Sequence, residues 1–323
     1  MAVALTFPGQ GSQSVGMGRA IADAFFEARA VFEAVDDALG EKLTDVIWNG
    51  PIETLTLTQN AQPALMAVSI AVLRVLEARD VVVHRKIAYV AGHSLGEYTA
   101  LAAAGSLSVA HAARLLRTRG RAMQEAVPVG DGAMAALIGL ELADAREIAA
   151  AAADGQVCEP ANDNGAGQVV ISGDRDAVQR AVELARERGA KRALILPVSA
   201  PFHCALMAPA AKVMEAALAD VALSAPSVPL VSNVTAAPVT DPAEIRRRLV
   251  EQVTGMVRWR ESIAWLSRCG IDQFVEVGAG KVLSGLARRI VPAAATFSVE
   301  TPRDVDQLLA KLTWSENGIR CSS

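Results

Sequence analysis

The segment Gly92-His93-Ser94-Leu95-Gly96 constrains the fold of this chain more than any other feature. It follows a short apolar run, residues 87–91, and precedes residues 96–104, which have helical character, so it predicts a sharp turn between strand and helix. Glycines flank the serine because side chains there would clash where the helix meets the strand. The turn would lift the Ser94 hydroxyl above a parallel sheet, near backbone N–H groups of the helix N-terminus. We interpret Ser94 as a nucleophile; the alternative is a chance match in a glycine-rich chain.

A nucleophilic serine needs a base, and the chain has four histidines. His93 adjoins the serine, so its side chain is expected to point away, and we interpret it as structural. His84 and His111 are expected at the surface or its boundary. His203 follows a loop signal after a predicted strand, and loops at strand ends often carry functional groups. Elimination therefore favours His203 as the base; the alternative is a buried, hydrogen-bonded histidine.

No Asp or Glu stands out as the third member of a Ser-His-acid triad. Either a carboxylate or a backbone carbonyl could hold the histidine Nδ1–H, and the sequence leaves both open. The glycine-rich segment 7–13 follows the first strand but lacks the third glycine of a dinucleotide-binding motif. Such a loop can instead bring a backbone N–H to an oxyanion. Arg119 lies in a helical stretch after the serine, where an arginine beside an acyl site would select an anionic acyl group; the alternative is a solvated helix face.

Composition excludes several classes of function. The 31 basic and 35 acidic residues give a net charge of −4, which argues against nucleic acid as the main partner. Four cysteines and four histidines show no metal-ligand spacing, so we expect no metal site and reduced thiols in a cytoplasmic protein. The best candidate for a membrane span, residues 100–113, is interrupted by polar residues and glycine. We therefore expect no membrane segment, and the N-terminus lacks the features of a secretory signal.

The order of predicted elements indicates an α/β fold with two domains. Strands are expected at 2–7 and 87–91, and helices at 18–39, 62–75, with Pro63 in a first helical turn, and 96–104. From about residue 130 the order becomes β-α-β-β-α-β, with elements at 133–140, 144–153, 157–161, 168–172, 174–188, capped by Asp174, and 192–198. The larger pattern then resumes with elements at 206–219, 228–234, 274–277 and 280–290, before a loose tail at 314–323. We expect a ferredoxin-like small domain at 129–199 inserted into a large domain at 1–128 and 200–323.

Several strings in one order cover nearly the whole chain, to about residue 290. They are FPGQGSQ (7–13), GHSLGEYTAL (92–101), Arg119-Gly120 with Met123-Gln124, GQVVISG (167–173), FHCALM (202–207), Asn233-Val234 and EVGAGKVL (276–283). In these strings the chain resembles the malonyl-CoA:acyl carrier protein transacylases of type II fatty acid synthesis. The resemblance implies a large α/β-hydrolase-like domain with a parallel central sheet and a ferredoxin-like insert, in agreement with the predicted order of elements.

The resemblance also implies roles for individual residues. Ser94 would be the acylated nucleophile, and His203 its base and later its acid. Arg119 would hold the free carboxylate of the malonyl group. The remaining implied roles are an oxyanion hole from the backbone N–H groups of Gln10 and Leu95, orientation of the histidine by the backbone carbonyl of Gln252, and lining of the site by Gln62 and Asn162.

The substrates implied are malonyl-CoA and holo acyl carrier protein, with no cofactor, and we expect a monomer. Lys191-Arg192 and Arg288-Arg289 are candidate contacts for the acidic carrier protein; solvated faces are the alternative. Phe202 replaces the serine of some relatives, and its bulk favours malonyl over branched methylmalonyl. The rival interpretations are a serine hydrolase or thioesterase and a non-catalytic scaffold. Within the transferases, an acyltransferase of a polyketide pathway or of malonate decarboxylase is the alternative.

Overall fold

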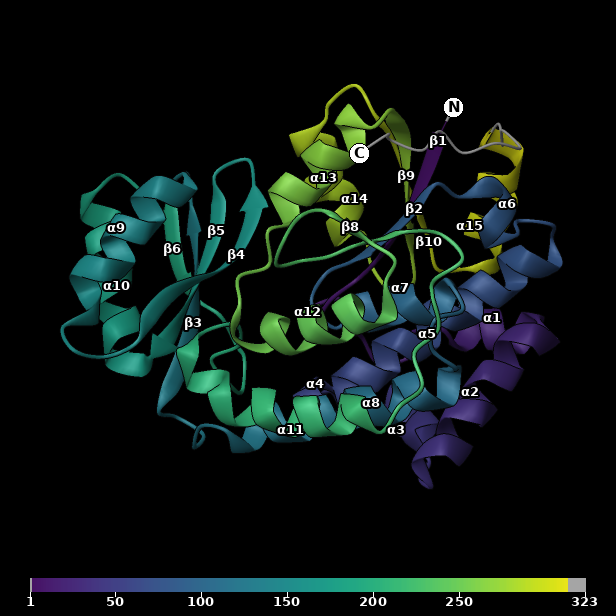
Figure 1. Ribbon diagram of the computed structural model, residues 1–323, viewed down its shortest axis with the longest axis horizontal. Coiled ribbons are helices and arrows are strands. Elements are labelled where there is room, and N and C mark those ends of the chain that lie inside the picture. Colours follow the sequence, from purple (N-terminus) through teal and green to yellow (C-terminus); the bar gives the residue numbers. More distant parts are fainter. Residues whose placement is uncertain (1, 313–323) are drawn as a thin grey trace.

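The computed structural model describes residues 2–312 and contains two β-sheets surrounded by helices (Figure 1). The larger sheet has the strand order β10-β9-β1-β2-β7-β8. Its strands are β1 (Ala2–Phe7), β2 (Tyr89–Gly92), β7 (Leu230–Val231), β8 (Pro238–Val239), β9 (Ile271–Val277) and β10 (Ala295–Val299). Neighbouring strands are parallel, except that β8 runs antiparallel to β7. The fold class is therefore α/β, as predicted.

Helices on both faces cover the larger sheet. Before the small sheet they are α1 (Arg19–Ala24), α2 (Phe26–Leu39), α3 (Leu43–Asn49), α4 (Ile52–Thr56), α5 (Thr58–Ala78), α6 (Val83–Lys86), α7 (Gly96–Ala103) and α8 (Val109–Glu125). After it come the short 3-10 helix η1 (Ala205–Met207), α11 (Ala208–Ala219), α12 (Pro242–Thr254), α13 (Trp259–Arg268), α14 (Val282–Ile290) and α15 (Pro302–Lys311).

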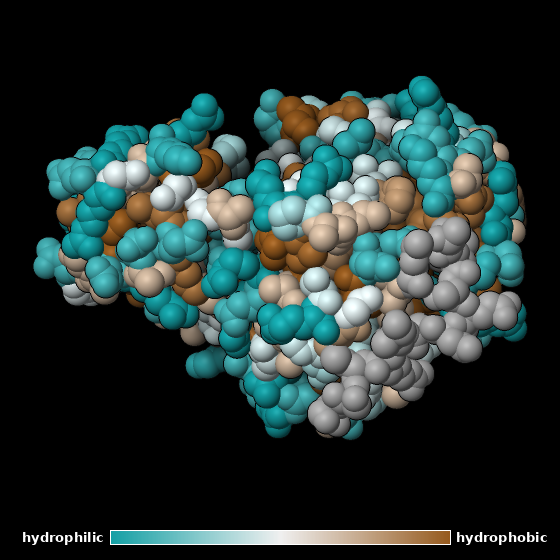
Figure 2. Space-filling view, turned by 90° about the horizontal axis from the view of Figure 1, so that it is seen from above, coloured by the Kyte–Doolittle hydropathy of each residue, from teal (hydrophilic) through white to brown (hydrophobic). Residues whose placement is uncertain are grey.

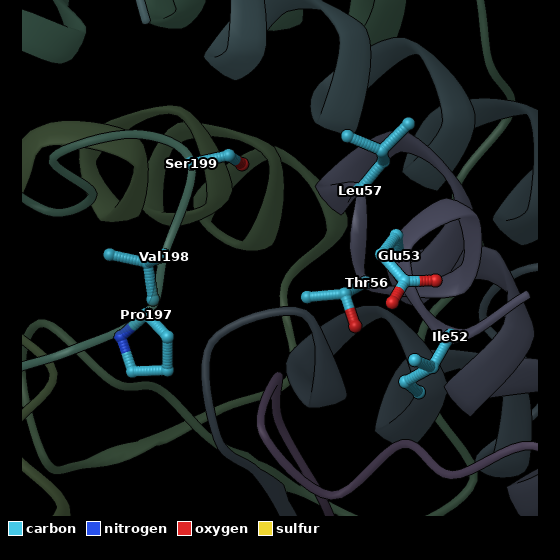
Figure 3. A pocket seen from close by; sticks show the side chains of 7 residues that line it. All are labelled: Ile52, Glu53, Thr56, Leu57, Pro197, Val198 and Ser199. Carbon is cyan, nitrogen blue, oxygen red and sulfur yellow. The ribbon is translucent and has the colours of Figure 1, made fainter. Parts of the chain in front are cut away.

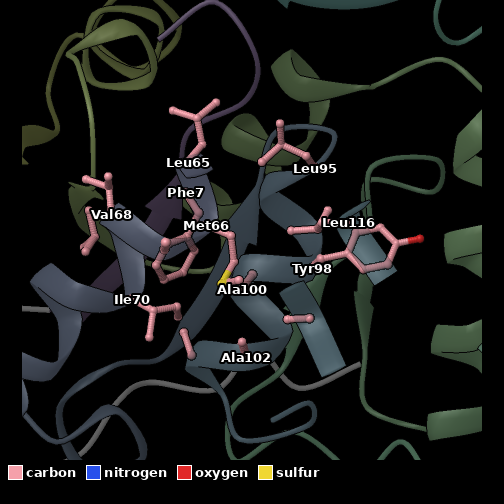
Figure 4. Close-up of a cluster of buried hydrophobic side chains, with 14 of the residues drawn as sticks. Phe7, Leu65, Met66, Val68, Ile70, Leu95, Tyr98, Ala100, Ala102 and Leu116 are labelled. Atoms are coloured by element: carbon pink, nitrogen blue, oxygen red, sulfur yellow. The ribbon is translucent and has the colours of Figure 1, made fainter. Parts of the chain in front are cut away.

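Strand β1 shows why the sheet is covered on both sides. All six of its residues are buried. Val3, Leu5 and Phe7 belong to the main core, whereas Ala2 and Ala4 face the second core, which is formed with α13 and α14. This is the two-residue alternation of a strand, with apolar residues on both faces because helices cover each face. Figure 4 shows Phe7 packed among side chains of α5, α7 and α8 in the main core.

The second sheet lies to one side of the larger one (Figure 1). Its four strands, β3 (Gly132–Ile138), β4 (Cys158–Gly165), β5 (Gln168–Asp174) and β6 (Arg192–Ile195), have the order β4-β5-β3-β6 and are all antiparallel. Helices α9 (Leu142–Ala153) and α10 (Arg175–Glu187) share a separate apolar core with this sheet. We call residues 132–195 the small unit. In Figure 2 the surface is hollowed between the small unit and the rest of the molecule.

Some element predictions were wrong in detail. The stretch 18–39 forms two helices, because Phe25 is extended between α1 and α2. Pro63 lies inside α5, since that helix begins earlier, at Thr58. Asp174 precedes α10 but does not cap it, because its carboxylate accepts a hydrogen bond from the Val157 N–H at 2.7 Å. Strands β6 and β7 are shorter than expected, and residues 314–323 of the expected tail lie outside the described residues.

Helix α5 is the one described helix that is long and apolar enough to cross a membrane. The sequence analysis expected no membrane segment and named residues 100–113 as the best candidate for one, whereas the structure gives this place to α5. In the structure 83% of the most apolar window of α5 is buried inside the protein. The apolar character of α5 is accounted for by its place in the main core, between α2, α7 and α8.

Candidate active site

The turn around Ser94 is as tight as the flanking glycines suggested. A Cβ atom on Gly92 would lie 1.9 Å from the backbone of Gly96, and one on Gly96 would lie 2.3 Å from the Phe7 carbonyl oxygen. Strand β1, strand β2 and helix α7 therefore approach each other more closely than any side chain permits. Ser94 itself has a φ of +54°, a left-handed conformation that is strained for a residue other than glycine.

Asn233, which follows β7, fixes this turn. The Ser94 N–H donates to Asn233 Oδ1 at 2.8 Å, and Asn233 Nδ2 donates to the Gly92 carbonyl at 2.7 Å. One amide side chain thus bonds the backbone on both sides of the turn. Sequence reasoning gave Asn233 no role, because the strand expected at 228–234 placed this residue inside a strand, whereas β7 ends at Val231.

His203 lies against the serine. The distance from Ser94 Oγ to His203 Nε2 is 2.7 Å, and His203 Nδ1 is 2.8 Å from the Gln252 carbonyl oxygen and 3.1 Å from that of Gly255. Because carbonyls only accept, Nδ1 carries the proton and Nε2 presents its lone pair to Ser94. Burial, aided by the charge of Arg119, lowers the pKa of His203 to about 3, so the imidazole is neutral at pH 7.

Arg119 of α8 is 1% exposed, yet it forms no salt bridge with any Asp or Glu in residues 2–312. Its Nη1 donates to Gln62 Oε1 at 2.8 Å. Its Nη2 donates to Gln252 Oε1 at 2.9 Å and lies 3.2 Å from Ser94 Oγ. A buried guanidinium held by neutral amides keeps its charge available for an anion beside the serine.

Gln10 and Leu95 have free backbone donors in segments that adjoin the Ser94 turn. Their N–H groups form no hydrogen bond within the described residues. Leu95 directly precedes α7, and the Gln10 side chain is held where its Oε1 accepts from Thr58 Oγ1 at 2.8 Å. The segment before Gln10 packs closely on the turn, since a Cβ on Gly9 would lie 2.8 Å from the His93 carbonyl oxygen. Two unpaired N–H groups near a nucleophile can bind an oxyanion.

Asn162, which was predicted to line the site, is not connected to Ser94, His203 and Arg119 in the same way. It lies in β4, is buried, and pairs through its backbone with Val257. No hydrogen bond joins its side chain to Ser94, His203 or Arg119 within the described residues. The small unit reaches the turn through a different residue: Asn164 Oδ1 is 3.0 Å from His93 Nε2, and burial lowers the pKa of that histidine.

The remaining candidates form no hydrogen bond with Ser94 Oγ within the described residues. His84 is exposed and His111 half-buried, and His93 packs on Trp259 at 5.5 Å between ring centroids, as expected of a structural residue. The four arginine and lysine residues proposed for carrier contact are all exposed, at 191, 192, 288 and 289. No group of three His, Cys, Asp or Glu side chains in residues 2–312 could hold a metal ion.

A cavity of about 320 Å³ lies beside Gln10, between α4 and the segment that leads from β6 to His203 (Figure 3). Gln10 Nε2 reaches the Thr56 carbonyl in its wall at 3.5 Å. Its lining is mainly apolar and consists of Ile52, Glu53, Thr56, Leu57, Pro197, Val198 and Ser199.

Glu97, in the first turn of α7, is a buried acid that sequence reasoning missed. Its carboxylate accepts a hydrogen bond from Gln252 Nε2 and a longer one, 3.4 Å, from the Asn233 N–H. Burial raises the pKa of Glu97 to about 7, against the effect of these hydrogen bonds and of Arg119. The only signal in the sequence was its position next to Gly96, at the start of the helix that follows the serine.

Comparison with known proteins fits this arrangement. The family model described as "Acyl transferase domain" matches residues 5–301. A relative from Escherichia coli strain K12, named malonyl CoA-acyl carrier protein transacylase, is 45% identical over 93% of this chain and 96% of its own length. The chain belongs to the acyl transferase family. It is therefore an acyltransferase.

Other relatives and solved structures agree with this assignment. A protein of the same name from Bacillus subtilis is 42% identical over 96% of this chain and 97% of its own. An acyl-carrier-protein S-malonyltransferase from Bartonella henselae is 56% identical, with a TM-score of 0.94 over 96% of this chain and 99% of that one. A malonyl-transacylase solved in complex with a type II PKS acyl-carrier protein is 40% identical, with a TM-score of 0.93 over 97% and 100% of the two chains.

Proposed function

We propose that this acyltransferase moves the malonyl group from malonyl-CoA to the phosphopantetheine thiol of acyl carrier protein in fatty acid biosynthesis, through a malonyl-serine intermediate. The observation that carries the proposal is the buried Arg119 guanidinium, 3.2 Å from Ser94 Oγ and without an acidic partner in the described residues. An acyl chain that ends in a carboxylate would supply that partner. The names of the relatives support the same donor and acceptor.

In the first half-reaction the malonyl carboxylate pairs with Arg119. Ser94 Oγ attacks the thioester carbonyl carbon as its proton passes to His203 Nε2, 2.7 Å away. The N–H groups of Gln10 and Leu95 bind the oxyanion, and one such donor typically contributes about 2.7–4 kcal/mol. The C–S bond then breaks, and the departing CoA sulfur takes the proton from Nε2. The Gln252 carbonyl stabilises the protonated imidazole that forms between these two transfers.

In the second half-reaction the same groups act in reverse. The carrier thiol gives its proton to His203 Nε2 and attacks the malonyl-serine ester, and Ser94 Oγ recovers the proton as it leaves. CoA and the carrier occupy the site in turn, so ping-pong kinetics are expected. Both thiols end a pantetheine arm, and we assign this arm to the mainly apolar cavity beside Gln10. No step requires a cofactor, and Gln62 and Asn162 serve as lining residues.

The proposal includes the finer description of the fold. The small sheet order β4-β5-β3-β6, with its two helices on one face, supports a ferredoxin-like domain at 129–199. The turn at Ser94 on a parallel sheet supports an α/β-hydrolase-like domain at 1–128 and 200–323. The protein would act as a cytoplasmic monomer, and the exposed basic pairs at 191–192 and 288–289 are the proposed contacts of the acidic carrier.

The test uses purified protein with malonyl-CoA, with and without holo acyl carrier protein. Without the carrier, we expect one equivalent of CoA to be released and a malonyl adduct on Ser94 by mass spectrometry. With the carrier, malonyl transfer should continue until a substrate is exhausted. Continuous CoA release without acceptor would instead identify a hydrolase, and the lack of any adduct would identify a non-catalytic scaffold. A parallel assay with a polyketide carrier protein separates the two pathways.

A further inference from the structure

Glu97 is a buried acid for which the proposed mechanism has no use. It is 1% exposed and forms no salt bridge within the described residues. Burying an ionisable carboxyl is unfavourable unless strong partners compensate it. Its main partner is the side-chain amide of Gln252, which belongs to α12, far away in the sequence.

The Gln252 amide joins Glu97 to Arg119. Its Nε2 donates to the Glu97 carboxylate and, at 2.9 Å, to the Ser94 carbonyl oxygen, whereas its Oε1 accepts from Arg119 Nη2 at 2.9 Å. Ionised carboxylates only accept, and guanidinium groups only donate, so the amide fits between them in one orientation. When Glu97 is ionised, a buried negative charge and a buried positive charge therefore lie on opposite ends of one amide group.

This spacing solves a problem that a direct ion pair would create. A buried arginine needs a compensating negative charge, but a carboxylate bound directly to the guanidinium would occupy the donors that a substrate carboxylate requires. One amide group in between lets Glu97 attract the guanidinium while Nη2 remains directed at Ser94.

Resting on the proposed function, we propose that Glu97 is a positioning residue for acyl-group selectivity: through the Gln252 amide it holds Arg119 beside Ser94 and leaves the guanidinium open to the carboxylate of the acyl group. The residue does not touch the reacting atoms. Its loss should therefore affect transfer of a carboxylated acyl group much more than transfer of an uncharged one.

A second buried glutamate provides a matched control. Glu276, at the end of β9, is 0% exposed, and its carboxylate accepts from the Leu283 N–H at 3.0 Å and the Ser284 N–H at 2.7 Å. These are backbone groups at the start of α14, away from Arg119. Glu276→Gln removes a buried negative charge just as Glu97→Gln does, but it leaves the Gln252 bridge intact.

The experiment measures kcat/KM for malonyl-CoA and acetyl-CoA, with holo acyl carrier protein as acceptor, in the wild type, Glu97→Gln and Glu276→Gln. We expect Glu97→Gln to lower the malonyl-to-acetyl ratio about tenfold, the size of one charge-assisted hydrogen bond. Glu276→Gln should leave the ratio unchanged. An equal loss for both substrates in Glu97→Gln, or no loss, would overturn the proposal by reducing Glu97 to a structural residue.

If circular dichroism shows that Glu97→Gln does not fold, Gln252→Met tests the bridge instead. This variant keeps the backbone carbonyl on His203 Nδ1 and removes only the amide. A fall in the malonyl-to-acetyl ratio is expected, and an unchanged ratio would overturn the proposal. A wild type that transfers no malonyl group at all would refute the proposed function itself, which is a different result from a wild-type ratio in the variants.

Discussion

Two strand–turn–helix connections at the same edge of the large sheet differ in how they are held. The connection from β2 to α7 places Ser94, a residue other than glycine, at a φ of +54°. In the connection from β9 to α14, the left-handed positions are occupied by glycines, Gly278 and Gly280. The β9–α14 turn is stabilised locally, by Glu276 bonded to the first N–H groups of α14, whereas the β2–α7 turn is fixed from outside by Asn233.

The difference separates a structural turn from the turn that we propose to be catalytic. In a turn that serves only the fold, glycine adopts the left-handed backbone conformation, and nearby backbone groups form the hydrogen bonds of the polar side chain. In the β2–α7 connection the proposed nucleophile takes that position, and the polar groups around it come from α8, α12 and the segment after β7. Strain at a residue other than glycine persists only where the surroundings enforce it, which is typical of functional sites.

The largest contrast is expected between serines of the two connections. Ser94→Ala should abolish the malonyl adduct and lower transfer by at least about 10⁴-fold, because the nucleophile is lost. Ser284→Ala, which removes a 2.8 Å hydrogen bond to the Phe297 carbonyl, should leave transfer intact and lower stability by about 1 kcal/mol. Mass spectrometry after incubation with malonyl-CoA checks the adduct. Label retained by Ser94→Ala would assign the nucleophile elsewhere.

Glycine-to-alanine changes should sharpen the comparison next. In Gly92→Ala the new methyl group would meet the Gly96 backbone at 1.9 Å, so we expect a loss of about 4 kcal/mol or more in the free energy of unfolding. Gly285, inside α14, has no atom within 4 Å of such a methyl group, and alanine there should stabilise the helix by about 0.5–1 kcal/mol. Urea unfolding measures both. Equal changes in the free energy of unfolding would mean that the Ser94 turn is packed less tightly than the contact between Gly92 and Gly96 implies.

The glycines and Ser94 could be predicted because their constraint is local: the turn needs them within five consecutive residues. The order of elements in the small unit was predictable for the same reason, since it depends on short apolar repeats. Residues that act across the chain carried no such pattern. Asn233 and Glu97 reach Ser94 and Gln252 only after β7 and α12 are packed, and a polar residue beside a buried strand looks alike whether it bonds solvent or another element. The end of β7 was misjudged: the strand was expected to reach residue 234, but its paired backbone ends at Val231, where the apolar run also ends.

Arg119 of α8, which lies beside the Ser94 turn, and Arg288 of α14 should differ in a substrate-specific way. Arg119→Ala should lower kcat/KM for malonyl-CoA about 100-fold, because the carboxylate loses a buried charge-assisted partner, and should spare acetyl-CoA. Arg288→Ala, on the exposed face of α14, should leave the release of one equivalent of CoA from either ester unchanged when no carrier is present. Steady-state rates with holo carrier protein as acceptor test Arg119→Ala, and single-turnover CoA release tests Arg288→Ala. A similar loss for acetyl and malonyl in Arg119→Ala would count against a carboxylate-binding role.

The last prediction concerns the pH dependence of stability. The folded-state pKa of Glu97 is about 7, above its ordinary value of 4.5, so the stability contributed by the protonated carboxyl is present below pH 4.5 and is lost as the pH rises through 7. Glutamine stays neutral. The free energy of unfolding of Glu97→Gln, relative to that of the wild type, should therefore rise on the order of 2–3 kcal/mol between pH 4.5 and 8. The ionisable groups that the wild type and the variant share cancel in this difference.

For the control Glu276→Gln, the free energy of unfolding relative to the wild type should rise less over the same pH range. Two short backbone hydrogen bonds oppose the burial that raises the pKa of Glu276. Urea unfolding at several pH values gives both slopes, and a flat difference for Glu97→Gln would mean that Glu97 is ionised throughout. A variant that is more stable at pH 8 yet less selective for malonyl would show that the protein keeps an ionised acid beside Arg119 at a cost in stability.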